Sequence, residues 1–302
     1  MTSSISARTA WIGPFPWKRT LLRISLALII LASQVPAAQG QSVQDRQLFS
    51  QAARARLLHD YADPGISWLL MDASGSLIAD RWLSPDKLYW PAISPGSLVK
   101  PFLAVAYGEQ HHNVFPRVRC LGTETHCWLP SGHGTLGLED AIAQSCNTYF
   151  LNLAEQLNRS QAAQTFARYG LNGPASTAGA ESLIGLGTDW KESPLAVARA
   201  YLQLENEQQL PAQSRIVRGM LESAALGTAR AVDAALGPNA ALAKTGTAVC
   251  SHTPKGAADG FTVVLYPAAQ PRLLLLVRVH GKTGAESARI AGAMLRSLEA
   301  GN

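Results

Sequence analysis

Apolar residues follow two different periods along this chain, and the order of these periods constrains the fold most. Short apolar runs, which are typical of strands, lie on both sides of the turn-forming stretch 72–76 and occur again after Pro238. Between about residues 98 and 235, the apolar residues instead have helical spacing. The sequence therefore predicts five strands, at Ile66–Met71, Leu77–Trp82, Ala241–Ala248, Phe261–Tyr266 and Leu273–His280. The predicted helices are 98–107, 138–158, 162–169, 194–204, 217–226 and a terminal helix at 285–299.

Strands at both ends of a chain with helices between them are typical of an α+β fold. We expect the N- and C-terminal strands to share one five-stranded antiparallel sheet that carries the terminal helix on one face. The helical middle would lie on the other face or beside it, so that a groove forms between the two parts.

Length and charge narrow the classes of partner. The chain has 302 residues, of which 47% are hydrophobic and 16% charged, enough for one large domain or two small ones. Its net charge is +5, but the lysines and arginines are scattered and form no run with aromatic residues. Nucleic acid is therefore not an expected partner. A mildly basic surface suits an anionic cell-wall polymer and equally a charge balance for solubility.

The first forty residues have the order of a secretory signal. Lys18, Arg19 and Arg23 precede the apolar run Ile24–Ala32, and small residues follow around Pro36. We therefore expect a signal peptide at 1–40, a domain at 41–302, and export to the periplasm or another extracytoplasmic space. The apolar run is shorter than the roughly 20 residues of a membrane span, but an uncleaved anchor stays an alternative.

Four cysteines follow this segment: Cys120, Cys127, Cys146 and Cys250. In an oxidising compartment, Cys120 and Cys127 could close a short loop as a disulfide, although sequence alone leaves the pairing open. The chain has no Cys-x-x-Cys, so we expect no structural metal and no cofactor.

Ser97 and Lys100 form a Ser-x-x-Lys sequence at the start of a predicted helix. One helical turn places both side chains on the same side, and a lysine in a partly dry pocket can accept the proton of a nucleophilic serine. Ser97 alone could equally be a helix cap. A second copy, Ser84 to Lys87, begins with Ser-Pro in an expected loop, and we interpret it as surface.

Two further short sequences offer polar groups. Ser145 and Asn147 could relay a proton and hold a substrate carbonyl, although a capping serine with a solvated asparagine is the simpler interpretation of this pair alone. Lys244-Thr245-Gly246-Thr247 on a predicted strand could bind a carboxylate at close approach. The second copy, 282–284, is interpreted as a turn that caps the last helix.

The order of Ser-x-x-Lys, Ser-x-Asn and Lys-Thr-Gly resembles the transpeptidase domain of penicillin-binding proteins. The resemblance covers the chain from about Ile66 to the C-terminus. It implies that Ser97 attacks a D-Ala-D-Ala peptide or a β-lactam, with Lys100 as general base. It also implies that Ser145 and Lys244 move protons, that Asn147 holds the substrate amide, and that Thr245, Gly246 and Thr247 bind the terminal carboxylate.

The same resemblance leaves three functions open. We expect a D,D-transpeptidase or carboxypeptidase that acts on peptidoglycan stem peptides. The alternatives are a non-catalytic scaffold or regulatory protein with a cell-wall protein partner, and a serine β-lactamase. The sequence Ser145-Cys146-Asn147 has Asn where class D β-lactamases typically have Val, which argues against the last alternative.

Overall fold

The computed structural model describes residues 35–82, 91–250 and 258–299. These residues belong to two compact units, Met1–Gln51 and Ala52–Asn302. Helix α2, Val35–Asp60, begins in the first unit and ends in the second, where Ala53 and Leu57 are buried. The second unit contains every predicted site residue.

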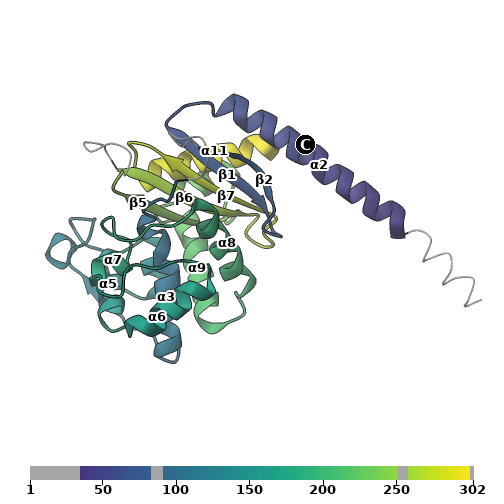
Figure 1. Cartoon of the computed structure of the whole chain (residues 1–302). Helices are drawn as coiled ribbons and strands as arrows, with labels where there is room; N and C mark the ends of the chain where they lie inside the picture. Colours follow the sequence, from purple (N-terminus) through teal and green to yellow (C-terminus); the bar gives the residue numbers. More distant parts are fainter. Residues whose placement is uncertain (1–34, 83–90, 251–257, 300–302) are drawn as a thin grey trace, which may run out of the picture. The chain divides into compact units, whose positions relative to one another are not determined.

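A five-stranded antiparallel sheet organises this second unit, as the sequence predicted (Figure 1). The strand order is β2-β1-β7-β6-β5, so β7 and β6 lie between the N-terminal hairpin of β1 and β2 and the edge strand β5. The strands are β1 Ile66–Asp72, β2 Leu77–Arg81, β5 Leu242–Ala248, β6 Asp259–Tyr266 and β7 Leu273–Val279. Strands from the N- and C-terminal parts of the domain therefore share one sheet, and the fold is α+β.

Helices pack against the sheet at both faces. Helix α11, Gly284–Glu299, packs on β5, β6 and β7, whereas α8, Pro194–Asn206, contacts β6 and β7 from the helical part of the unit (Figure 1). Because helices cover both faces of the sheet, β7 has a nearly continuous apolar sequence of Leu and Val. Its residues after Leu273 are all buried.

The helical part lies between β2 and β5 in the sequence. It contains η1 Gly96–Val99, α3 Lys100–Gln110, η2 Gly122–Thr125, α4 Leu138–Ala143, α5 Asn147–Glu155, α6 Arg159–Arg168, α7 Ala180–Leu183, α8, α9 Pro211–Ala225 and α10 Ala231–Leu236. A small antiparallel pair, β3 Val118–Cys120 and β4 Gly134–Leu136, was not predicted. Strands this short have too few residues to show an alternating pattern.

The predicted single helix at 138–158 is wrong. Helix α4 ends at Ala143 and α5 begins at Asn147, because Ser145 takes a left-handed backbone conformation with φ of 52°. Such a φ is uncommon for a residue with a side chain, and it costs of order 1–3 kcal/mol unless the surroundings hold it. The break places Ser145 in a tight connection rather than on a helix face.

The interpretation of residues 282–284 as a helix-capping turn is confirmed. Glu286 N–H donates to Thr283 Oγ1 at 3.3 Å, and Thr283 N–H donates to Glu286 Oε2 at 2.9 Å. This reciprocal pair is a capping box at the start of α11. The predicted signal peptide lies mainly in residues 1–34, outside the described residues, as do Ser84 and Lys87. Among the helices of the described part, none is long and apolar enough to span a bilayer.

Candidate active site

Ser97 lies in η1, one turn before the buried Lys100 at the start of α3. The turn packs against β5 at very close range: a Cβ on Gly96 would lie 2.6 Å from the Thr247 carbonyl oxygen. Gly96 also has φ of 56°, which favours glycine. A Cβ on Gly246 would meet Leu98 Cγ and Pro95 O at 3.0 Å each. Two glycines thus allow the Ser97 turn to lie directly beside the Lys-Thr-Gly strand.

Lys100 connects the Ser-x-x-Lys sequence to the Ser-x-Asn sequence. Its Nζ donates to Asn147 Oδ1 at 2.6 Å and to the Ser145 carbonyl oxygen at 2.7 Å. Burial lowers the pKa of Lys100 to about 7, although Cys146 and Cys127 act in the opposite direction. A substantial neutral fraction near neutral pH is the state that a general base requires.

Lys244 connects the Lys-Thr-Gly sequence to the Ser-x-Asn sequence. Its Nζ donates to Ser145 Oγ at 2.8 Å and to the Thr245 carbonyl oxygen at 2.7 Å. Burial, and then repulsion from Lys100, lower the pKa of Lys244 well below its usual range. Lys244 and the Ser145 hydroxyl thus form a hydrogen-bonded pair through which a proton can move, and Lys100 contacts the backbone of the same serine.

Asn147 is buried at 8% exposure, so the interpretation of this residue as a solvated asparagine is wrong. Ser145 is not a helix cap either, because the residue that precedes α5 is Cys146. The fold thus brings Lys100, Ser145, Asn147 and Lys244 into one hydrogen-bonded cluster beside the Ser97 turn.

The two threonines of the Lys-Thr-Gly strand differ in their surroundings. Thr245 is buried and donates to Thr228 Oγ1 at 2.6 Å, whereas Thr247 is exposed and its Oγ1 accepts from Gly284 N–H at 3.0 Å. The exposed Thr247 hydroxyl is the one of the two that a ligand reaches without displacing a buried contact.

Sequence reasoning missed two neighbours of the cluster. Trp128, half exposed, donates from Nε1 to the Ser145 carbonyl oxygen at 3.2 Å. Thr228 holds Thr245 and donates to the Ala143 carbonyl oxygen at 3.3 Å. The short sequence Gly227-Thr228-Ala229 also resembles the family, which was a usable signal for Thr228, whereas a lone tryptophan in a loop has none.

The disulfide considered between Cys120 and Cys127 is not formed. All four cysteines lie among the described residues, where each is buried and none forms a disulfide. Both Cys120 Sγ and Cys127 Sγ lie 3.5 Å from Nδ1 of His133 instead, and Cys127 Sγ lies 3.8 Å from Cys146 Sγ. The fold of this loop thus brings the thiols of Cys120 and Cys127 close to the side chains of His133 and Cys146.

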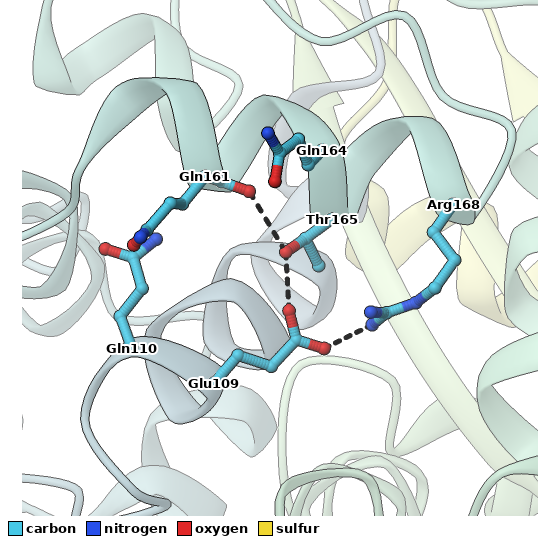
Figure 2. Close-up of a pocket in the computed structure, with 6 residues that line it drawn as sticks. All are labelled: Glu109, Gln110, Gln161, Gln164, Thr165 and Arg168. Atoms are coloured by element: carbon cyan, nitrogen blue, oxygen red, sulfur yellow. Dashed lines mark hydrogen bonds and ion pairs between the residues drawn. The ribbon is translucent and has the colours of Figure 1, made fainter.

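A separate hollow on the helical part contains none of the predicted residues. Figure 2 shows Glu109 at its centre, where it accepts hydrogen bonds from Arg168 and, at 2.6 Å, from Thr165. Because these polar groups are paired with one another, the hollow offers little unsatisfied chemistry, and the cluster around Lys100 is the candidate active site.

A known protein family matches most of this chain. The model of the penicillin binding protein transpeptidase domain matches residues 84–298, most of the chain. The chain belongs to the penicillin-binding protein transpeptidase domain family. This family match confirms the resemblance drawn from the three short sequences.

Solved structures of penicillin-binding proteins share the fold. Pseudomonas aeruginosa PBP2, in complex with WCK 5153, matches with a TM-score of 0.66 and 20% identity over 83% of this chain and 73% of that chain. The transpeptidase domain of Burkholderia pseudomallei penicillin-binding protein 3 matches with a TM-score of 0.65 and 16% identity, over 86% and 95%. Helicobacter pylori PBP2, solved in complex with MreC, matches with a TM-score of 0.65 and 18% identity, over 83% and 62%. No curated protein sequence matches the chain.

Proposed function

We propose that this transpeptidase-domain protein is an acyl-serine enzyme that acts on D-Ala-D-Ala stem peptides of peptidoglycan, as a D,D-transpeptidase or carboxypeptidase. The observation that supports it most is the cluster in which Lys100 binds Asn147 while Lys244 binds Ser145. Burial of two lysine amines costs free energy, and groups with a pKa perturbed in this way are typical of functional sites.

In the acylation step, the Ser97 hydroxyl attacks the carbonyl of the D-Ala-D-Ala bond and its proton passes to neutral Lys100. A tetrahedral oxyanion forms, and the Ser97 and Thr247 backbone N–H groups are proposed as its donors. The loss of one such donor costs roughly 3 to 4 kcal/mol in other acyl-transfer enzymes. The C–N bond then breaks, and the leaving D-Ala amine takes a proton through Ser145, which Lys244 contacts.

The acyl ester on Ser97 is then released by a second nucleophile. An amine of another stem peptide gives a cross-link, and water gives a shortened peptide. We assign substrate placement to Asn147 for the amide and to Thr247, Gly246 and Thr245 for the terminal carboxylate. Export across the cytoplasmic membrane by residues 1–40 fits this substrate, because peptidoglycan lies outside that membrane. A cell-wall protein partner is proposed on the same ground.

Release of D-Ala from a stem pentapeptide tests this function. Purified protein is incubated with the peptide alone and with a second stem peptide that provides an acceptor amine. We expect free D-Ala from the wild type and none from Ser97→Ala, with a joined peptide product if the enzyme is a transpeptidase. No D-Ala from a folded wild-type protein under either condition would contradict turnover and favour the scaffold alternative.

A further inference from the structure

Three cysteines and one histidine converge in the part of the domain that precedes α5. One ligand atom each from Cys120, Cys127, His133 and Cys146 lies within 4.8 Å of the others. They come from different elements: Cys120 ends β3, Cys127 follows η2, His133 precedes β4, and Cys146 caps α5. All three cysteines are buried.

The spacing of these atoms matches the edges of a tetrahedron around a zinc ion. With Zn–S near 2.3 Å and Zn–N near 2.0–2.1 Å, tetrahedral edges are about 3.8 Å between sulfurs and about 3.5 Å between sulfur and nitrogen. The Cys127 and Cys146 sulfurs are 3.8 Å apart, and His133 Nδ1 lies 3.5 Å from both the Cys120 and Cys127 sulfurs.

Hydrogen bonding alone does not account for this packing. A neutral imidazole nitrogen accepts one hydrogen bond, yet two thiols approach the same Nδ1 of His133. Cys127 lies at a similar range from Cys146, and thiols are weak donors and acceptors. Three thiol sulfurs and one imidazole nitrogen directed at one point are the arrangement of a closed structural zinc site.

The surrounding loop is built to hold these atoms. Gly122 and Gly132 both have φ of 73°, and a Cβ on either would lie within 2.4 Å of a backbone oxygen, Pro130 O or Cys120 O. Thr148 Oγ1 donates to Cys120 Sγ at 3.3 Å, and the Gly122 and His133 backbone N–H groups also bind that sulfur. Such outer hydrogen bonds orient metal ligands. The Trp128 ring packs edge-on against His133, with centroids 5.3 Å apart, and fixes the imidazole.

We propose that Cys120, Cys127, His133 and Cys146 bind one Zn²⁺ ion in a tetrahedral structural site. Because Cys146 lies between Ser145 and Asn147, the ion fixes the middle residue of the Ser-x-Asn sequence to the β3–β4 pair. This contact provides the restraint that the left-handed backbone of Ser145 requires. The sequence analysis expected no metal because the chain has no Cys-x-x-Cys. The four proposed ligands are instead dispersed between residues 120 and 146, and no such short spacing marks them.

Zinc content tests the site independently of catalysis. The protein is purified without a histidine tag or chelating resin, and its metal content is measured by inductively coupled plasma mass spectrometry. We expect one zinc per chain in the wild type and in Cys250→Ser, whose cysteine lies outside the cluster. We expect at least a tenfold lower zinc content in Cys120→Ser and in His133→Ala, and recovery in His133→Cys, which restores a thiolate ligand.

Two measurements on the wild-type protein cover the case in which these variants do not fold. Removal of zinc by a chelator should lower the melting temperature, and added Zn²⁺ should restore it. Added Co²⁺ should give the visible spectrum of tetrahedral thiolate coordination. A folded wild-type protein that holds no zinc, binds none when it is supplied, or carries a disulfide among Cys120, Cys127 and Cys146 by peptide mapping would overturn the proposal. None of these results depends on D-Ala release, so the metal site and the proposed reaction stand or fall separately.

Discussion

Lys244 Nζ donates a hydrogen bond of 2.8 Å to Ser145 Oγ, and this contact joins the sheet to the helical part of the domain. Lys244 belongs to β5, whereas Ser145 lies in the connection between α4 and α5. Lys100 reaches the same connection from α3, through the Ser145 carbonyl oxygen. The candidate active site is therefore the place where three separate elements meet, and changes to any of them should affect acylation.

Asn147→Ala should slow acylation by a β-lactam about 10- to 100-fold. The change removes the acceptor 2.6 Å from Lys100 Nζ, and hydrogen bonds to charged groups contribute about 1.5–3 kcal/mol. Stopped-flow measurement with a chromogenic β-lactam gives the acylation rate. Asn152→Ala is the matched control in the same helix, where the side chain binds Gln156 rather than a site residue. Equal rates in the two variants would contradict the role of Asn147.

Acylation should accelerate as the pH rises through about 7. Burial lowers the pKa of Lys100 to about 7, so its neutral, proton-accepting form accumulates above that pH. The groups that face Lys100 are Lys244 of β5 and the thiols of Cys146 and Cys127. The acylation rate measured from pH 5 to pH 9 checks this expectation. Lys100→Arg, which stays charged, should be slow throughout, and a wild-type rate that falls between pH 6 and pH 8 would rule out Lys100 as the base.

Gly96→Ala should destabilise the protein and abolish acylation. The new Cβ would lie 2.6 Å from the Thr247 carbonyl oxygen, in a backbone conformation that disfavours side chains. Gly170→Ala is the matched control, because Gly170 has a similar φ of 70° and open space around the added Cβ. In urea denaturation we expect a loss of about 1 kcal/mol for Gly170→Ala and a larger loss for Gly96→Ala. A smaller loss at Gly96 would mean that the turn is not packed on β5.

Glu139→Gln should cost about 1–3 kcal/mol of stability at pH 7, a range reduced for solvent screening of this partly exposed pair, and the cost should disappear as the pH falls below about 2. Hydrogen bonds from Arg215, at 2.7 Å to both carboxylate oxygens, lower the pKa of Glu139 from 4.5 to about 2. A lowered carboxyl pKa adds stability above the unfolded value, which is lost as the pH falls from about 5 to 2. Denaturation midpoints of wild type and variant check this. The exposed Glu155→Gln should change little, and a similar loss in both variants would argue against the Arg215 pair.

The sheet was predictable from sequence because β1, β6 and β7 are largely apolar runs that are long enough to show their period. The helix break at Ser145 was not, since the apolar spacing continues through 138–158 and the left-handed φ depends on tertiary contacts at this connection, among them those from Lys100 and Lys244. Ser97, Lys100, Ser145, Asn147 and Lys244 were found because three short sequences occur in one order. Trp128 and the convergence of Cys120, Cys127, His133 and Cys146 depend on how a loop folds back, which no local pattern encodes.

The most direct test of the central claim is the mass of the intact protein after incubation with a β-lactam. The account predicts a stable increase equal to the mass of the drug in the wild type and in Ser84→Ala, and no increase in Ser97→Ala. Peptide mapping should place the added group on Ser97. An adduct that persists in Ser97→Ala, or a folded wild-type protein that neither gains mass nor hydrolyses the drug, would contradict Ser97 as the nucleophile.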